Sequence, residues 1–334
     1  MAVYPKAAMS FPLKPLALLF GLALAACTVR PTTPPAGNGP DGLMAWPDLL
    51  ERPRPAPDHV VRYGDHPRQV VDLYVPEGPG PHPVVVMIHG GCWSAPWDRA
   101  LMNWAADDLR RRGIAVWNID YRVIENGNGY PHVFQDNWAA IARLAADGRH
   151  LNLNRDLNLD LERVAAVGHS AGGHLALWYA AKRSRWSPPP TVRMIPPTSF
   201  KAVISLGGLP DLELAARPPG SGCGTEVIDQ LIGRGQPRWR PELFHDTTSP
   251  PTDPFADTSV PRMGPLGIPQ VLINGTEDRI IPTHYAEDYA GKMRAQGDDV
   301  RVRLIPRTGH VELIAPGSAA WAAAVEEIER ALGR

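Results

Sequence analysis

The chain has 334 residues, long enough for one large domain or two small ones, and its 44% hydrophobic content is ample for a core. Its 34 basic and 35 acidic residues give a net charge of -1, so it carries no electrostatic signature of nucleic-acid binding. The composition argues against a mostly disordered chain or a membrane bundle and favours small or neutral ligands.

Residues 1–26 are typical of an export signal. Lys6 and Lys14 precede an uncharged apolar run over residues 16–26. The run is too short to span a bilayer, which takes about 20 residues. A basic start, a short apolar stretch and small residues at its end together predict a secretory signal peptide.

The end of this run, Leu24-Ala25-Ala26-Cys27, resembles the lipobox of bacterial lipoproteins. That resemblance implies that Cys27 becomes the acylated first residue of the mature protein, and Thr28 then implies sorting to the outer membrane. A plain signal peptide followed by a chance cysteine is the alternative. The sequence leaves open whether the natural start is Met1 or Met9.

Residues 27–58 are rich in proline, a composition that keeps a chain extended and semi-rigid. We expect this segment to tether a folded domain, residues 59–334, to the membrane surface. Its apolar stretch over residues 43–50 could dock back on that domain.

Strands alternate with helices along residues 59–334. An opening antiparallel pair is predicted over residues 60–63 and 69–75. Further strands are predicted over residues 83–89, 114–120, 163–167, 201–206, 269–274 and 300–305. Helices are predicted over residues 100–112, 133–146, 173–181, 283–296 and 318–332. This alternation indicates a mostly parallel, doubly wound sheet with helices on both faces.

Residues 207–268 interrupt this alternation. They are rich in Pro and Gly and predict at most short helices, such as one over residues 225–232. Loops of that size inside a compact domain are usually lids or binding loops. We therefore expect a lid-like insertion that covers a site.

The most informative motif is Gly168-His169-Ser170-Ala171-Gly172, which spells G-x-S-x-G between a predicted strand and a predicted helix. Small residues permit the tight, strained turn that such a junction needs. The turn would present the Ser170 hydroxyl above the sheet, beside a helix N-terminus that favours an anion. A serine cap at an ordinary junction is the structural alternative.

Two further polar residues, Asp278 and His310, each follow a predicted strand, where active sites of open α/β sheets gather. The order Ser, Asp, His is the one this architecture uses for a catalytic triad. In that role His310 accepts the proton of Ser170, and Asp278 fixes the tautomer of His310. Glu277 is the alternative acid, but neighbouring side chains point apart.

A glycine-containing segment, His89-Gly90-Gly91-Cys92-Trp93, directly follows the predicted central strand. Glycines let the backbone approach a substrate closely. We expect the N–H groups of Gly91, Cys92 and Ala171 to form an oxyanion hole. Trp93 is predicted either to line the substrate pocket or to pack in the core.

Together these motifs resemble the α/β-hydrolase superfamily, in particular the esterase branch around kynurenine formamidase (arylformamidase). The matching segments are H-G-G-x-W at 89–93, D-Y-R at 120–122, G-H-S-A-G-G-H-L at 168–175 and G-H-V-E-L-I at 309–314. The resemblance covers most of residues 60–334 and implies an α/β-hydrolase fold. It places the family's nucleophile, acid and base on Ser170, Asp278 and His310. Hormone-sensitive-lipase relatives share part of the pattern but favour a third glycine where Cys92 stands.

Four nearby charged residues have simpler structural interpretations. Asp211 suits a helix cap before the insertion, and Glu312 suits a helix start or a loop carboxylate. Asp120 and Arg122 could bind a substrate carboxylate. An internal ion pair that fixes their loop is the favoured interpretation.

No metal site and no organic cofactor are expected. The chain has no C-x-x-C pair, and His169 and His174 lack a third ligand, so we expect both histidines to pack at the elbow. Export to an oxidising compartment would permit a bridge between Cys92 and Cys223. Because the two lie far apart in sequence, two unpaired buried cysteines are favoured.

The sequence therefore predicts a secreted, lipid-anchored serine hydrolase that cleaves a small carboxylic ester through an acyl-enzyme intermediate. Hydrolysis of an aryl formamide of the N-formylkynurenine type is the alternative reaction. Export argues against it, because tryptophan catabolism is cytoplasmic in the resembled family. A non-catalytic binding protein on a hydrolase fold is the alternative class. No nucleic-acid partner is expected, and membrane contact is expected through the lipid anchor only.

Overall fold

The computed structural model describes residues 37–155, 157–185, 198–234 and 253–334, which belong to one compact unit, Pro35–Arg334. The predicted signal peptide and Cys27 lie outside the described residues. No helix within the described ranges is long and apolar enough to cross a membrane.

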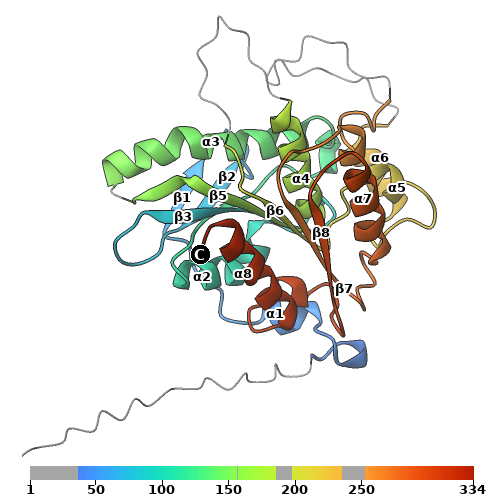
Figure 1. Ribbon diagram of the computed structural model, residues 1–334, viewed down its shortest axis with the longest axis horizontal. Coiled ribbons are helices and arrows are strands. Elements are labelled where there is room, and N and C mark those ends of the chain that lie inside the picture. The colour runs from blue at the N-terminus through green and yellow to red at the C-terminus, as the bar shows by residue number, and fades with distance from the viewer. Residues whose placement is uncertain (1–36, 156, 186–197, 235–252) are drawn as a thin grey trace, which may run out of the picture. The chain divides into compact units, whose positions relative to one another are not determined.

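An eight-stranded sheet forms the centre of this unit, in the order β1-β2-β4-β3-β5-β6-β7-β8 (Figure 1). The strands are β1 (His59–Arg62), β2 (Val70–Tyr74), β3 (His82–Ile88), β4 (Ala115–Ile119), β5 (Leu159–His169), β6 (Val203–Leu206), β7 (Gln270–Gly275) and β8 (Val300–Ile305). β1 and β2 pair antiparallel, β2 also pairs antiparallel with β4, and the other neighbours are parallel. The predicted opening pair and the mostly parallel sheet are confirmed.

Helices cover both faces of the sheet (Figure 1). α3 (His132–Arg155), α4 (Ala171–Ser184) and α7 (His284–Ala295) lie on one face, and α2 (Asn103–Arg111) and α8 (Ala319–Ala331) lie on the other. β3 is fully buried, with Val84 and Val86 in the first core cluster and Val85 and Met87 in the second. This two-sided burial is why β3 is an apolar run instead of an alternating one.

α3 continues to Arg155, beyond the end predicted at residue 146. The predicted end lies two residues before Gly148, and glycine often follows the last residue of a helix. In the structure a Cβ at Gly148 would lie 2.9 Å from a Leu161 methyl carbon. Gly148 therefore lies inside the helix, where its lack of a side chain allows α3 to pack closely against β5.

The predicted insertion over residues 207–268 holds only short helices where it is described. They are α5 (Leu212–Ala215), α6 (Thr225–Leu231) and the 3₁₀ turn η5 (Val260–Arg262). Residues 235–252 lie outside the described ranges. A lid function for this insertion stays a prediction.

The apolar stretch over residues 43–50 docks on the domain, as the sequence suggested. Its helix α1 (Trp46–Leu50) buries Leu49 completely in the cluster that also holds α2 and α8. The N–H of Met44 donates to Oε1 of Glu312, over 2.6 Å.

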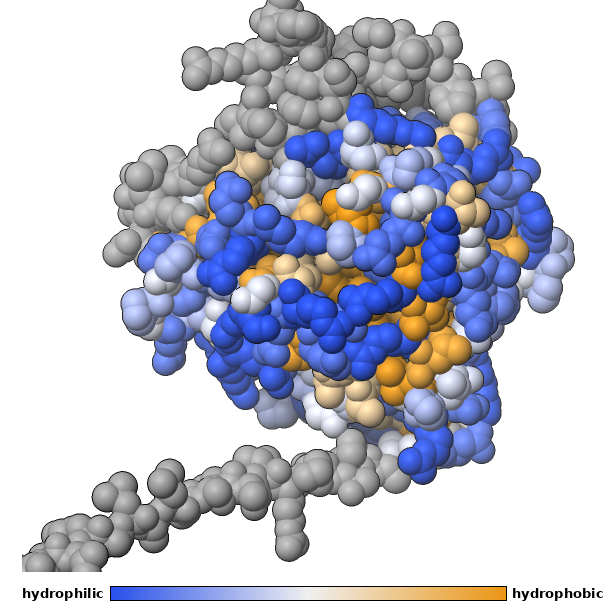
Figure 2. Space-filling view, in the orientation of Figure 1, coloured by the Kyte–Doolittle hydropathy of each residue, from blue (hydrophilic) through white to orange (hydrophobic). Residues whose placement is uncertain are grey.

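In the view of Figure 2, hydrophilic residues cover much of the surface and hydrophobic residues show between them.

Candidate active site

Ser170 lies at a sharp turn between β5 and α4. Its φ of 53° and ψ of -120° place a non-glycine residue in a sparsely populated backbone region. The turn is held by the Ser170 N–H, which donates to the Leu206 carbonyl over 2.8 Å. A Cβ at Gly172 would lie 2.1 Å from the Ile88 carbonyl oxygen, so only glycine allows α4 to approach β3 this closely. The local geometry is that of a strand-to-helix elbow.

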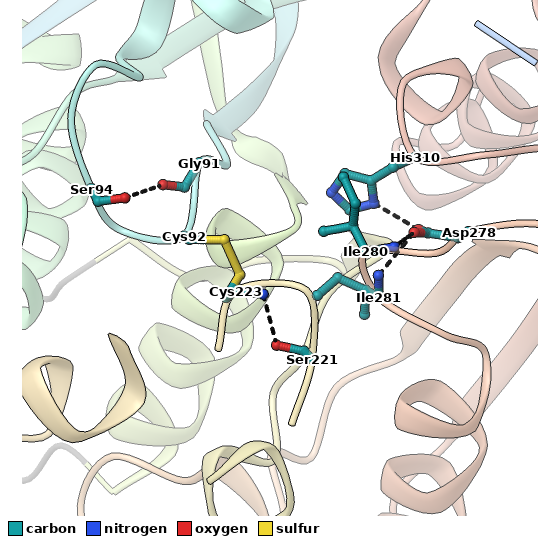
Figure 3. Close-up of a disulfide and its surroundings, with 9 residues drawn as sticks. All are labelled: Gly91, Cys92, Ser94, Ser221, Cys223, Asp278, Ile280, Ile281 and His310. Carbon is teal, nitrogen blue, oxygen red and sulfur yellow. Dashed lines mark hydrogen bonds and ion pairs between the residues drawn. A yellow bond between two sulfur atoms is a disulfide. The ribbon is translucent and has the colours of Figure 1, made fainter. Parts of the chain in front are cut away.

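Asp278 and His310 form a hydrogen-bonded pair (Figure 3). His310 Nδ1 lies 2.6 Å from Asp278 Oδ2, and both side chains are almost completely buried. The other carboxylate oxygen, Oδ1, accepts from the N–H groups of Ile280 and Ile281, over 2.9 and 2.8 Å. Both oxygens are therefore occupied, which fixes the orientation of the carboxylate. Glu277, the alternative acid, is exposed to solvent.

The elbow and the His310–Asp278 pair meet at the end of β6. Leu206 accepts the N–H of Ser170. At the next residue, Gly207, a Cβ would lie 3.2 Å from Asp278 Oδ2 and 3.2 Å from His310 Cε1. Ser170, at the end of β5, therefore adjoins the last residue of β6, and Asp278 and His310, which follow β7 and β8, adjoin the next residue along the chain. The three lie at the same edge of the sheet, where active sites of open α/β sheets gather.

The segment after β3 runs beside the elbow in an unusual conformation. Three consecutive residues, Gly91, Cys92 and Trp93, have φ values of 106°, 50° and 54°. A Cβ at the preceding Gly90 would lie 2.9 Å from the Cβ of Ser170, so the segment adjoins the serine. We call residues 90–94 the oxyanion loop.

The backbone donors predicted for the oxyanion hole are left free. In the part of the chain that the structure describes, the N–H groups of Gly91, Cys92 and Ala171 have no hydrogen-bond acceptor. Buried or half-buried N–H groups usually find a partner, so unpaired donors beside a candidate nucleophile suit an incoming oxyanion.

Cys92 and Cys223 form a disulfide, which contradicts the expectation of two unpaired cysteines. The two residues are 131 positions apart in sequence, which made a bridge look improbable. In the structure the oxyanion loop and the loop between α5 and α6 lie side by side (Figure 3). The two cysteines are therefore neighbours in space although they are far apart in sequence.

Trp93 is fully buried in the core cluster. Its ring meets that of His174 edge to face, with centroids 5.4 Å apart. This burial favours the core alternative for Trp93 over the pocket alternative.

His169 and His174 pack at the elbow, as expected. His169 Nε2 lies 3.2 Å from the His310 carbonyl oxygen, and His174 Nε2 lies 2.8 Å from that of Thr258. Because a carbonyl only accepts, each Nε2 carries the proton and donates. Burial lowers the pKa of His169 well below its usual value and lowers that of His174 to about 4. Both rings are neutral at pH 7, and no cluster of three or more His, Cys, Asp or Glu in the described ranges could hold a metal.

The predicted ion pair between Asp120 and Arg122 is wrong, because each has other partners. Asp120 accepts from His89 Nε2 over 3.1 Å and pairs with Arg68 and Arg99, each over 3.2 Å. Burial opposes the charge of Asp120, but the hydrogen bond from His89 and the nearby cations outweigh it, so its pKa is lowered. The carboxylate thus holds the side chain of His89, the residue directly before the oxyanion loop.

Arg122 pairs instead with Asp136, at the start of α3. Two of its guanidinium nitrogens donate to the two carboxylate oxygens, over 2.8 and 2.7 Å, and its own N–H adds a third bond of 2.9 Å. Gln69 Nε2 donates to the same carboxylate over 2.8 Å. Each charge serves the fold, and neither is left to bind a substrate carboxylate.

Asp211 caps α5, as expected, by accepting the Leu214 N–H over 3.1 Å, and it also pairs with Lys292. Glu312 begins the 3₁₀ turn η6 (Glu312–Ile314) and accepts the N–H groups of Gly309 and Met44. The expected role for Glu312 at a helix start is confirmed.

Sequence reasoning missed an aromatic pair beside His310. The rings of Trp46 and Trp97 lie 4.9 Å apart, and Trp46 meets His310 and His169 edge to face at 6.4 and 6.3 Å. Both tryptophans are half-buried. The apolar character of residues 43–50 was the available signal, but it did not say which part of the domain they would contact.

The sequence profile of the BD-FAE family matches residues 71–293 of the chain. The chain belongs to the BD-FAE family. Esterase LipC of Mycobacterium tuberculosis is 27% identical to this BD-FAE protein over 259 residues, which cover 75% of this chain and 58% of LipC. A probable isoprenylcysteine alpha-carbonyl methylesterase of rice is 28% identical over 269 residues, covering 76% of this chain and 58% of the rice protein. The chain thus spans less than two thirds of the length of both relatives.

Solved structures share the fold of this BD-FAE protein. Esterase B of Lactobacillus rhamnosis aligns with a TM-score of 0.63 at 20% identity, covering 84% of this chain and 87% of that one. A truncated carbohydrate esterase from gut microbiota also aligns with a TM-score of 0.63, at 18% identity, covering 84% of this chain and 98% of that one. These likenesses confirm the predicted α/β-hydrolase fold.

Proposed function

We propose that this BD-FAE protein is a serine esterase that cleaves a small carboxylic ester through an acyl-enzyme intermediate. The observation that carries the proposal is the meeting of a strained serine elbow with the hydrogen-bonded His310–Asp278 pair. Free N–H groups on the oxyanion loop and membership of the BD-FAE family support it. So do the esterase names of the relatives in Mycobacterium tuberculosis and rice.

In acylation, Ser170 Oγ attacks the ester carbonyl while His310 Nε2 accepts the hydroxyl proton. Asp278 holds the Nδ1 proton of His310, which keeps Nε2 as the base and stabilises the imidazolium that forms. Negative charge develops on the carbonyl oxygen, and the N–H groups of Gly91, Cys92 and Ala171 receive it. The imidazolium then protonates the leaving alcohol as its bond to the acyl carbon breaks.

In deacylation, water takes the place of the alcohol. His310 Nε2 removes a proton from the water as its oxygen attacks the acyl carbon, and the oxyanion hole binds the second tetrahedral intermediate. Collapse of that intermediate returns the proton to Ser170 and releases the carboxylic acid. Every step uses side chains and backbone groups of this chain.

Hydrolysis of an aryl formamide is the second candidate. The H-G-G-x-W segment at residues 89–93 and the G-H-S-A-G-G-H-L segment at 168–175 resemble kynurenine formamidase. The same serine, histidine and oxyanion donors would release formate from such a substrate. We rank ester hydrolysis first because of the family match and the esterase names of the relatives.

We further propose that the protein is exported and lipid-anchored at Cys27. Residues 1–26 have the sequence pattern of a lipoprotein signal, and the Cys92–Cys223 disulfide suits an oxidising compartment. Expression with labelled palmitate tests the anchor. Labelling of the wild type and its loss in Cys27→Ala would support the proposal, whereas an unlabelled wild type would contradict it.

The activity is tested with p-nitrophenyl acetate, a feruloyl ester and N-formylkynurenine as substrates, with Ser170→Ala as the matched control. We expect turnover of at least one ester and loss of that turnover in the variant. A fluorophosphonate should label the wild type and not the variant. Equal turnover by the two proteins would overturn the proposal, and turnover of N-formylkynurenine alone would favour the second candidate.

A further inference from the structure

We propose that the Cys92–Cys223 disulfide positions the oxyanion hole, so that an intact bond is required for fast acylation and fast deacylation. The proposal rests on the proposed function, because it assigns a role to the bond only if Ser170 acts as a nucleophile. It makes Cys223 a positioning residue for the reaction, although this residue lies in the insertion and outside every motif singled out in the sequence.

The backbone of the oxyanion loop is strained. The left-handed region is costly for residues with a Cβ, and here Cys92 and Trp93 both occupy it directly after Gly91. Such residues persist only where the surrounding structure holds them in place. Loss of a restraint should therefore let the loop relax and move the donors away from the oxyanion position.

Cys92 itself has few other restraints. The loop is pinned on both sides of it, by the Ser94 N–H on the Gly91 carbonyl at 2.9 Å and the Ile124 N–H on the Trp93 carbonyl at 2.8 Å. Within the described residues Cys92 makes no hydrogen bond, and its side chain is half-buried. Among the residues that the structure describes, the bond to Cys223 is therefore the one polar or covalent connection of Cys92 beyond its chain neighbours.

The far end of the bond lies next to the loop of the triad acid (Figure 3). The neighbour of Cys223, Gly222, donates its N–H to the Ile280 carbonyl over 2.7 Å. The N–H of Ile280 in turn donates to Oδ1 of Asp278. The disulfide thus joins the loop that carries the oxyanion donors to the loop that orients the triad acid, through one intervening hydrogen bond.

Breaking the bond should slow the chemical step more than substrate binding. Reduction adds two electrons and two protons and yields two thiols. A phosphine such as TCEP supplies the electrons, and water supplies the two protons and the oxygen of the phosphine oxide that forms. Removing an oxyanion donor entirely costs about a hundredfold to a thousandfold in kcat. A misplaced donor should cost less, about ten- to hundredfold, and KM should stay within about twofold because the ground-state ester makes no full bond to the hole.

The test compares wild type with Cys223→Ser, which breaks the bond without changing the sequence of the oxyanion loop. We expect kcat for p-nitrophenyl acetate to fall by about ten- to hundredfold, with little change in KM. TCEP should lower the kcat of the wild type to the level of the variant and leave the variant unchanged. Because TCEP acts on folded enzyme, this arm remains decisive if Cys223→Ser folds poorly, and far-UV circular dichroism should stay constant during the loss.

A glycine rescue separates positioning from general stabilisation. In Cys92→Gly combined with Cys223→Ser, glycine adopts the left-handed conformation without steric cost. We expect the double variant to regain most of the kcat that Cys223→Ser loses, although it also lacks the bond. A bond that merely stabilises the fold would give a double variant as slow and as heat-labile as the single one, and that result would overturn the proposal.

Two other results would also overturn the proposal. One is an unchanged kcat in Cys223→Ser. The other is an unchanged kcat in TCEP-treated wild type after mass spectrometry has shown that its disulfide is reduced. Ser170→Ala run in parallel distinguishes the two levels of failure. If Ser170→Ala is inactive and Cys223→Ser is fully active, the positioning role fails and the esterase proposal stands. If Ser170→Ala retains activity, the proposed function itself fails.

Discussion

The imidazole of His310 is held by the carboxylate of Asp278 over 2.6 Å, and the second oxygen of that carboxylate is held by the backbone at Ile280 and Ile281. The acid cannot rotate without losing three hydrogen bonds. Its orientation fixes which imidazole nitrogen carries the proton and leaves the other free as a base. The activity should therefore depend on the charge of Asp278 as much as on its position.

Asp278→Asn should abolish most of the activity while leaving the fold intact. The amide has nearly the same shape, but it cannot stabilise the imidazolium and favours the wrong histidine tautomer. We expect kcat on p-nitrophenyl acetate to fall by about ten-thousandfold. Glu277→Gln is the matched control, because this exposed neighbour makes no bond to His310, and it should retain wild-type kcat. A large loss of kcat in Glu277→Gln, together with a nearly normal kcat in Asp278→Asn, would instead identify Glu277 as the triad acid.

His174 should make the protein less stable as the pH falls. Burial lowers its pKa in the folded state to about 4, against an ordinary value near 6.5, so the unfolded chain binds the proton first. Stability is therefore complete above about pH 6.5 and is lost as the pH falls toward 4. Between pH 7.5 and 5, this residue should cost about 2 kcal/mol of unfolding free energy.

Urea unfolding of wild type and His174→Gln at several pH values measures this effect. Glutamine keeps a donor for the Thr258 carbonyl and does not titrate, so the stability of the variant should fall by about 2 kcal/mol less over the same pH range. Parallel curves for the two proteins would show that His174 does not titrate as its burial implies.

Asp136→Asn should destabilise the protein without a specific effect on catalysis. It removes the charge that pairs with the half-buried Arg122, and breaking a buried pair costs about 3–5 kcal/mol. Because Arg122 retains some exposure, we expect a loss of about 2–3 kcal/mol in the free energy of unfolding, measured with urea.

Arg122→Gln should raise KM no more for a negatively charged ester than for a neutral one. A selective rise for the charged ester would restore the idea that Arg122 binds a substrate carboxylate.

Trp46→Ala tests whether α1 is part of the folded domain. The tryptophan packs on Trp97 and meets the ring of His310, but it is only half-buried. We expect a loss of about 2 kcal/mol in unfolding free energy, below the 3–5 kcal/mol typical of a fully buried tryptophan. Trp46→Phe keeps most of the ring contact and should lose less than half of that amount. Identical unfolding curves for Trp46→Ala and wild type would mean that α1 adds nothing to stability.

The sheet and the elbow could be predicted because they depend on local patterns. The apolar run that became β3 has to be buried on both faces, and a G-x-S-x-G motif at a strand end is typical of a nucleophile elbow. The approach of Asp278 to His310 followed from strand order alone, because residues beyond parallel strand ends share one edge of the sheet.

Features that depend on which loops meet could not be predicted. Nothing in the sequence around Cys223 indicates that its loop reaches Cys92. Asp120 and Arg122 are two residues apart, which suggested a pair, but their side chains reach different partners on either side of the loop. The extension of α3 past Gly148 depends on contact with β5, which a helix pattern does not contain.

The central claim, that Ser170 carries the acyl group during turnover, is tested most directly by trapping the intermediate. Enzyme mixed with excess p-nitrophenyl acetate is quenched in acid during turnover, digested and analysed by mass spectrometry. We expect one acetyl group per protein, on the peptide that contains Ser170, and none in Ser170→Ala. An active enzyme that carries no acyl group, or one that carries it on another residue, would contradict the claim.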